Sequence, residues 1–272
     1  FIDKQPKLRV EINSLQYSDQ KWLEEKFIIA VTNIVDSSVI DSKRLLSLLK
    51  QYYGYNSFRD NQEEIIKSIM SGKDTIVLKP TGAGKSLCFQ LPALAMDGCA
   101  VVISPLISLM QNQVMALKQL GIKAEFINSS LTKNELNEIK KNIKDTKLLY
   151  ISPERFNIED FKSWLKTLKI PFFAIDEAHC ISRWGHDFRP DYTQLQSIKK
   201  EFKKPIIALT ATADLRTRSD IPVQLELDEY NLFISNFDRP NIKILVEEKN
   251  DYKSQLLRHL KDFKGESGVV YC

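Results

Sequence analysis

Between about residues 70 and 210, short runs of β-branched and other apolar residues alternate with longer segments whose apolar positions recur at helical spacing. This alternation is typical of a parallel sheet covered by crossover helices. The pattern therefore predicts an α/β fold with a mainly parallel sheet flanked by helices. The predicted strands are residues 75–78, 100–104, 125–127, 148–151, 172–176 and 206–209.

Two of the predicted helices carry signals at their ends. Thr132 and Glu135 have the spacing of a capping box at the start of an amphipathic segment. Another helix is predicted to begin at Asp41 and to end at Gly54, because glycine is favoured just after a helix. The apolar face of that helix is formed by Leu45, Leu48, Leu49 and Tyr52.

The ends of the chain predict a division into three parts. Residues 1–40 contain an apolar helical segment at about residues 22–35 but no chemical motif, so we expect an extension without an assigned role. Residues 41–236 are expected to form the first domain. Residues 237–272 are expected to begin with a connector, followed by a helix from about residue 251 and an apolar strand at 268–271. This helix and strand would begin a second domain of the same kind. We also expect the chain to be a fragment, because it opens on Phe1 and stops within an apolar strand.

Composition narrows the class of protein. Hydrophobic residues make up 43% of the chain, enough for a buried core, and no apolar run approaches the ~20 residues that cross a bilayer. We therefore expect no membrane partner and an intracellular protein, nuclear if eukaryotic and otherwise cytoplasmic. The formal net charge of +4 is compatible with nucleic-acid binding but does not require it. The four cysteines form no Cys-x-x-Cys pair, which favours free thiols over a zinc site or disulfides.

Residues 79–86, Lys-Pro-Thr-Gly-Ala-Gly-Lys-Ser, follow a predicted strand and precede a predicted helix. This is the context of a phosphate-binding loop, whose backbone N–H groups and helix N-terminus bind phosphate oxygens. Lys85 would neutralise the β- and γ-phosphates of ATP, and Ser86 would hold Mg²⁺. The strict pattern has glycine where Lys79 stands, a departure that is usual in superfamily 2 helicases, which this loop resembles. A chance turn is the alternative. The remaining predicted nucleotide contacts are Thr81, Gly82, Ala83 and Gly84.

Asp176 and Glu177 come directly after the predicted strand at 172–176. In a parallel sheet they would lie at the same edge as the phosphate loop. Asp176 would complete the Mg²⁺ shell and Glu177 would orient and deprotonate the attacking water, with Lys85 and His179 as further catalytic residues. An acidic helix cap is the alternative interpretation.

The motifs resemble those of the RecQ helicase family from about residue 45 to Cys272. Residues 53–62, Tyr-Gly-Tyr-Asn-Ser-Phe-Arg-Asp-Asn-Gln, look like its adenine-recognition motif. The resemblance implies that Tyr55 and Arg59 sandwich the base and that Gln62 hydrogen-bonds its edge. Asp60 departs from the family, in which proline is common at this position.

Other segments resemble motifs through which the family contacts DNA. Residues 104–114 and 152–155 resemble motifs that touch the DNA backbone, and implicate Ser104 and Arg155. Residues 209–213 resemble a motif that couples hydrolysis to DNA binding through Thr210 and Thr212. By itself the latter is also ordinary turn chemistry.

Residues 182–192, Ser-Arg-Trp-Gly-His-Asp-Phe-Arg-Pro-Asp-Tyr, resemble the aromatic-rich loop of RecQ enzymes. Trp184 and Phe188 would stack on unpaired bases, and His186 and Arg189 would contact DNA. Arg183 departs from the neutral or acidic residue common there. The alternative is that Trp184 and Phe188 are core aromatics.

The resemblance implies a RecA-like fold and an ATP- and Mg²⁺-dependent DNA helicase that moves 3′ to 5′ on single strands and unwinds forked duplexes. Because the family's arginine finger belongs to the second domain, this chain alone is expected to be weak or inactive. One alternative is an RNA-remodelling ATPase of the DEAH type, since residues 176–179 spell that motif. The other is a module that binds nucleotide without hydrolysing it. Protein partners are not predicted.

Overall fold

The computed structural model describes residues 42–185, 187–236, 245–261, 263 and 265–270. The chain divides between Asn236 and Phe237 into two compact units, which are described separately.

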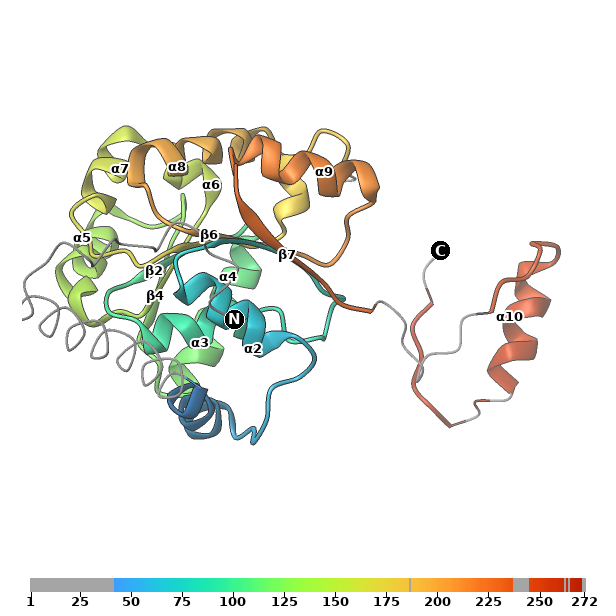
Figure 1. The fold of residues 1–272 in the computed structure, drawn as a ribbon. Coiled ribbons are helices and arrows are strands. Elements are labelled where there is room, and N and C mark those ends of the chain that lie inside the picture. The colour runs from blue at the N-terminus through green and yellow to red at the C-terminus, as the bar shows by residue number, and fades with distance from the viewer. Residues whose placement is uncertain (1–41, 186, 237–244, 262, 264, 271–272) are drawn as a thin grey trace, which may run out of the picture. The chain divides into compact units, whose positions relative to one another are not determined.

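The first unit is built on a seven-stranded sheet in which every neighbouring pair is parallel (Figure 1). The strand order is β3-β4-β2-β5-β6-β1-β7. The predicted α/β class with a parallel sheet is confirmed. The strands are β1 (Asp74–Leu78), β2 (Ala100–Ile103), β3 (Ala124–Ile127), β4 (Leu148–Ile151), β5 (Phe173–Ile175), β6 (Ile206–Thr210) and β7 (Tyr230–Ile234).

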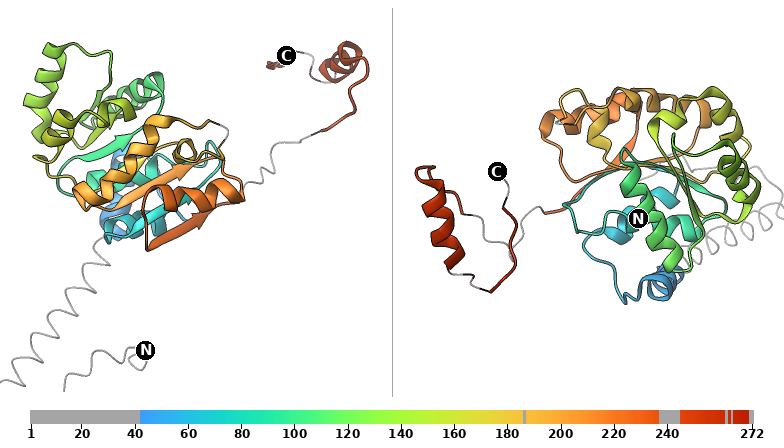
Figure 2. Two further views of the ribbon diagram at one scale, coloured as in Figure 1. Left: turned by 90° about the horizontal axis from the view of Figure 1, so that it is seen from above. Right: turned by 180° about the vertical axis from the view of Figure 1, so that it is seen from behind.

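Helices cover both faces of the sheet (Figures 1 and 2). One face packs against α2 (Gln62–Met70), α3 (Leu87–Ala95) and α4 (Ile107–Gln119), and the other against α5 (Lys133–Asn142), α6 (Pro153–Phe156), α7 (Glu159–Leu165), α8 (Ser197–Phe202) and α9 (Leu215–Gln224). Short helices lie between them: residues 42–48 run into η4 (Leu49–Tyr53), and η5 (Ile143–Asp145), η6 (Ala178–Ile181) and η7 (Pro190–Gln196) follow.

The two faces explain why the strands are continuous apolar runs. In β1, Val77 belongs to the cluster with α2, α3 and α4, whereas Ile76 and Leu78 belong to the opposite cluster. Because successive side chains of a strand point to opposite faces, a strand covered on both sides must be apolar at every position.

The six predicted strands are confirmed, with each end within one residue of the prediction. The capping box is present, and Gly54 ends its helix with a φ of 73°. Strand β7 was not predicted. It lies at the edge of the sheet, and its side chains alternate between half-buried and exposed, with Tyr230, Leu232 and Ile234 exposed.

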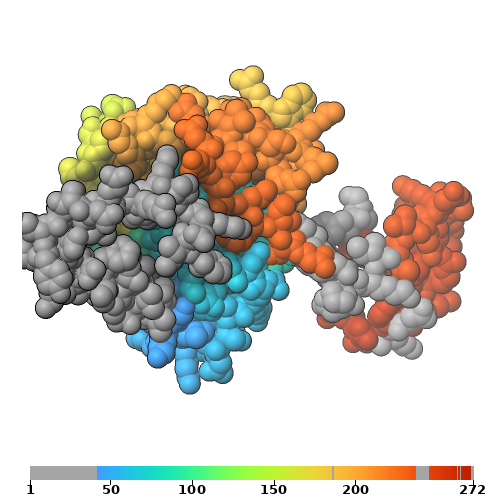
Figure 3. Space-filling model, viewed as in Figure 1, coloured from blue at the N-terminus to red at the C-terminus, as the bar shows by residue number. Residues whose placement is uncertain are grey.

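The α9–β7 region, coloured orange in Figure 3, forms part of the molecular surface. No helix in the described part of the chain is long and apolar enough to cross a membrane. Three cysteines, Cys88, Cys99 and Cys180, are buried free thiols as expected, and Cys272 lies outside the described residues.

In the second unit, the predicted helix is confirmed as α10 (Tyr252–Lys261). The strand predicted at 268–271 is wrong for residues 268–270, which form no strand and leave Val269 78% exposed. A strand needs a neighbour for its backbone groups, and none pairs with this segment among the described residues. Tyr271, Asp41 and the segment at 22–35 lie outside the described residues.

Candidate active site

The phosphate loop and the acidic motif reach the same edge of the sheet. The loop follows β1 and the carboxylates follow β5, and β6 lies between these two strands. All three strands are parallel, so their carboxyl ends meet at one edge, where open α/β sheets bind ligands. Thr210, the last residue of β6, therefore lies between the two motifs.

The phosphate loop has the backbone that its sequence predicts. Gly82 and Gly84 have φ values of 83° and 77°, which L-residues rarely adopt. A side chain on Gly84 would also meet Gln62 Nε2 at 2.4 Å. Ser86 is the N-cap residue of α3, and Lys85 Nζ donates to the carbonyl oxygen of Lys79 at 3.1 Å. The loop therefore places Lys85 and Ser86 at the N-terminus of α3, and a helix N-terminus stabilises a bound anion.

Asp176 and Glu177 form a turn at the end of β5. The backbone N–H of Glu177 donates to Asp176 Oδ1 at 3.1 Å, and Glu177 has a left-handed φ of 49°. Such conformations are uncommon for non-glycine residues and cluster at functional sites. Burial, and secondly the negative charge of Glu177, raise the pKa of Asp176 to about 6, against the opposing influence of Lys85.

The donor set at this edge fits Mg²⁺. An enclosed carboxylate whose pKa is raised by burial and by a second carboxylate is stabilised when a hard cation binds it. Asp176 and the hydroxyl of Ser86 are the oxygen ligands that this chain offers. Both belong to loops that leave the same edge of the sheet.

The residues expected to recognise adenine lie just before α2 and at its first residue. The Arg59 guanidinium carbon lies 5.4 Å from the centroid of the Tyr55 ring, so the two side chains expected to sandwich a base stack on each other. Gln62 is 2% exposed; its Nε2 donates to the Gly84 carbonyl at 3.1 Å, and its Oε1 accepts the Arg59 N–H at 2.9 Å. Gln62 therefore joins this segment to the phosphate loop, which the sequence did not predict.

His179 is buried and contacts the end of β6. Its Nδ1 lies 2.9 Å from Thr210 Oγ1 and 3.4 Å from Glu177 Oε2. The Thr210 hydroxyl also donates to the Thr212 carbonyl at 3.0 Å. His179 thus links the acidic motif to the segment after β6 rather than facing solvent.

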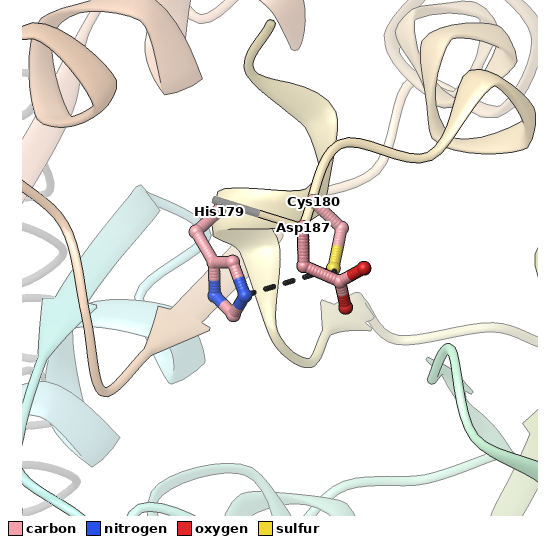
Figure 4. Close-up of side chains that lie close together, drawn as sticks. All are labelled: His179, Cys180 and Asp187. Carbon is pink, nitrogen blue, oxygen red and sulfur yellow. Dashed lines mark hydrogen bonds between the residues drawn. The ribbon is translucent and has the colours of Figure 1, made fainter. Parts of the chain in front are cut away.

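The same histidine is connected to the aromatic-rich loop (Figure 4). Cys180 Sγ lies 3.8 Å from His179 Nε2 and 3.8 Å from Asp187 Oδ2. These three ligand atoms are close enough to hold a metal ion. However, burial raises the pKa of the Cys180 thiol to about 12, and Asp187 Oδ2 is 3.1 Å from Arg189 Nη2. The arrangement therefore favours a chain of hydrogen bonds over metal binding.

The aromatic-rich loop packs its backbone against this turn and exposes its tryptophan. Trp184 is 64% exposed, with the Arg216 guanidinium 5.7 Å from its ring centroid, whereas Phe188 is half-buried. A side chain on Gly185 would meet the His179 carbonyl oxygen at 2.5 Å. The interpretation of Trp184 as a core aromatic is therefore wrong, and glycine is needed where the loop approaches the backbone of His179.

Two basic residues of the loop were expected to contact DNA. Arg189 is engaged within the protein, since Nη1 donates to the Pro105 carbonyl at 3.0 Å and Nη2 pairs with Asp187. It thereby connects the loop to the segment after β2. His186 lies outside the described residues.

The expectation that the Ser104 hydroxyl reaches DNA phosphates does not fit the structure. Ser104, the residue after β2, is 1% exposed, and its Oγ has no hydrogen-bond partner among the described residues. Ser108, near the start of α4, is the exposed serine of the same motif. Arg155 is half-buried, with its guanidinium 5.5 Å from the Phe161 ring, and Thr212 is exposed.

Comparison with known proteins assigns the family. The family model described as DEAD/DEAH box helicase matches residues 59–221, more than half of the chain. The chain belongs to the DEAD/DEAH box helicase family. Among its helicase relatives, ATP-dependent DNA helicase RecQ of Haemophilus influenzae is 48% identical over 87% of this chain and 39% of its own length. RecQ of Pasteurella multocida is 49% identical over 84% of this chain and 36% of its own length.

The resemblance to RecQ helicases is therefore confirmed, and the chain spans about two fifths of the length of these relatives. Among solved helicase structures, DUF1998 helicase MrfA bound to DNA and AMPPNP matches with a TM-score of 0.60 at 17% identity, over 81% of this chain and 34% of that one. A hypothetical ATP-dependent RNA helicase from Sulfolobus tokodaii matches with a TM-score of 0.55 at 15% identity, over 71% and 57%. These structures share the RecA-like fold.

Proposed function

We propose that the protein containing this chain is an ATP- and Mg²⁺-dependent DNA helicase of the RecQ type, which moves 3′ to 5′ on single strands and unwinds forked duplexes. The observation that carries the proposal is a continuous connection at one sheet edge. The acidic motif is linked through His179 to Thr210 and through Cys180 to the loop that exposes Trp184. A DNA-responsive loop built onto a nucleotide site suits a motor whose hydrolysis depends on DNA.

Each residue of the site has a distinct part in this proposal. The phosphate loop and Lys85 bind and neutralise the phosphates, and Glu177 orients the attacking water and accepts its proton. Asp176 and Ser86 would hold Mg²⁺, which when bound offsets negative charge on the phosphate oxygens. Tyr55 and Arg59 separate to admit the adenine between them, and the nearby Gln62 keeps the base against the phosphate loop.

The proposal includes the domain boundaries along the chain. Residues 41–236 would form the first motor domain and residues 237–272 the connector and beginning of the second. Residues 1–40 remain without a role. In the wider protein, the second domain would close over the exposed edge of the first and complete the ATP site.

The names of the relatives favour DNA over RNA as the substrate. RecQ relatives at 48% and 49% identity are called DNA helicases, whereas the RNA helicase match shares only the fold. The intact Lys85, Asp176 and Glu177 favour hydrolysis over simple nucleotide binding.

The proposal is tested on the whole protein with a forked DNA duplex and a forked RNA duplex of the same sequence. We expect Mg-ATP-dependent separation of the DNA fork that requires a 3′ single strand, and no separation of the RNA fork. Unwinding of the RNA fork at an equal rate would identify the remodelling ATPase instead. ATP binding without hydrolysis in the presence of DNA would identify the binding module.

A further inference from the structure

Lys79 has a fully buried side chain at the start of the phosphate loop. Its Nζ lies 2.8 Å from Asn61 Oδ1, 2.9 Å from Ser235 Oγ and 3.6 Å from Asp60 Oδ2. Asn61 and Ser235 also lie close to each other, with their oxygens 3.4 Å apart. Three oxygen atoms from two distant parts of the chain therefore surround one buried ammonium group.

Two departures from the expected motifs meet in this cluster. Lys79 stands where the strict phosphate loop has glycine, and Asp60 stands where RecQ enzymes commonly have proline. Asp60 has a φ of 44°, which proline cannot adopt because its ring fixes φ near −65°. The departure at residue 60 thus gives the segment a turn that brings an acidic side chain toward Lys79.

The main chain of Lys79 touches the rest of the nucleotide site. Its N–H donates to the Thr210 carbonyl at 3.1 Å, and its carbonyl accepts from Lys85 Nζ at 3.1 Å. Gln62, next to Asn61 in sequence, donates to the Gly84 carbonyl. The adenine-recognition segment is therefore held to the phosphate loop at two points, through Gln62 and through the side chain of Lys79.

We propose that Lys79 is a positioning residue that fixes residues 59–62 against the phosphate loop and so sets the preference of the site for adenine nucleotides. An ammonium group removed from water is costly unless oxygen acceptors surround it, so the segment cannot move away without leaving this charge unpaired. Ser235, the residue after β7, completes the set of acceptors. The inference rests on the proposed function, because it assumes that Tyr55, Arg59 and Gln62 receive an adenine.

The test measures the affinities of Mg-ATP and Mg-GTP for the full chain and for Lys79→Met, which retains length and apolar volume but removes the ammonium group. We expect ATP affinity to fall roughly tenfold or more, the size of effect typical of a lost charged hydrogen bond, and GTP affinity to change much less. Lys73→Met, an exposed substitution just before the same strand, is the matched control and should leave both affinities unchanged. Thermal melting of each variant is measured alongside.

Two further variants keep the inference testable if Lys79→Met does not fold. Asn61→Ala and Ser235→Ala each remove one acceptor and retain the lysine, and each should lower the ATP affinity more than the GTP affinity. Equal losses for the two nucleotides, no loss in any variant, or a wild-type chain that does not prefer ATP would overturn the inference. Failure of the proposed function is distinguishable, since it would appear as unchanged binding of both nucleotides in Lys85→Ala.

Discussion

His179 Nδ1 and Thr210 Oγ1 lie 2.9 Å apart and join the acidic motif to the strand between it and the phosphate loop. Thr210 also accepts the Lys79 N–H through its carbonyl, so one residue contacts both halves of the nucleotide site. Because the Thr210 side chain is 0% exposed, its hydroxyl cannot exchange these partners for water. We therefore expect a change in the segment after β6 to be transmitted to His179 and to Glu177 beside it.

Replacing Thr210 by valine keeps the shape of the side chain and removes the hydroxyl. The Thr212 N–H group then loses its acceptor and His179 Nδ1 loses its hydrogen-bond partner, at a cost of about 1–3 kcal/mol in stability. We expect DNA-stimulated ATP hydrolysis by the whole protein to fall on the order of tenfold, with a smaller change in ATP affinity. Thr167→Val, which removes an exposed hydroxyl bonded to the Trp164 carbonyl, should change neither quantity. Full DNA stimulation in Thr210→Val would show that this contact does not transmit the signal.

Variants of Lys85 and Glu177 are expected to impair different steps, ATP binding and ATP hydrolysis respectively. Lys85→Ala removes the charge that faces the phosphates, so ATP affinity should fall. Glu177→Gln removes the group that accepts the water proton, so nucleotide should still bind while hydrolysis falls by roughly 10²- to 10⁴-fold. Equilibrium binding and single-turnover hydrolysis by the whole protein separate the two effects. Wild-type hydrolysis by either variant would mean that the catalytic site has been wrongly assigned.

The raised pKa of Asp176 predicts a pH-dependent stability in the absence of divalent cations. Its pKa in the folded protein, about 6, lies above the ordinary value of 3.8. The folded protein therefore keeps a proton that the unfolded chain loses first, and the stabilising contribution present below about pH 4 is lost as the pH rises through about 6. Asp176→Asn mimics the neutral carboxyl group and should lose this dependence.

Thermal melting of both proteins in chelator, from about pH 4 to about pH 7, checks the prediction. The melting temperature of the wild type should decline relative to that of Asp176→Asn across this interval. Two parallel profiles would mean that Asp176 titrates near its ordinary pKa. Adding Mg²⁺ above about pH 6 should raise the stability of the wild type alone, because only the ionised carboxylate binds the cation.

The sheet, and the edge of it at which residues 79–86 and the acidic pair meet, could be predicted because their signals are local. The strands of the core are apolar at successive positions, as in β2, since both faces are covered. The phosphate loop needs Gly82 and Gly84 for its backbone, and the acidic pair follows a buried strand directly. In each case a few neighbouring residues determine the geometry.

What the sequence did not reveal depends on contacts between distant segments. Strand β7 pairs with β1, far away in the sequence, and its exposed side chains, Tyr230, Leu232 and Ile234, are apolar, so residues 230–234 lack the apolar–polar alternation that indicates a half-exposed strand. Ser104 belongs to a recognisable motif, yet its burial depends on the packing of the folded protein rather than on neighbouring residues. The partners of Lys79 include Ser235, 156 residues away, and no local pattern indicates that such a pair will meet.

Replacing Trp184 by alanine distinguishes a DNA-contacting role of this side chain from a structural role. Its side chain is 64% exposed, so Trp184→Ala should change stability by no more than about 0.5 kcal/mol, with a small addition for the contact with Arg216. Stacking on an unpaired base is worth roughly 1–3 kcal/mol, enough to shift a loop between two conformations. Asp187 of this loop contacts Cys180, and Cys180 contacts His179. We therefore expect a change in the conformation of the loop to alter the position of His179.

In the whole protein, Trp184→Ala is therefore expected to keep its ATP affinity and melting temperature, while stimulation of ATP hydrolysis by single-stranded DNA is blunted and unwinding is lost. Trp164→Ala is the matched control, because Trp164 is half-buried and its ring centroid lies 5.2 Å from that of Phe161. That variant should lose stability, up to about 3 kcal/mol, and retain DNA stimulation. ATPase assays with and without single-stranded DNA, together with thermal melting, compare the two. If Trp184→Ala were strongly destabilised, or if its stimulation by DNA equalled that of the wild type, Trp184 would not be the residue through which DNA acts on the ATP site.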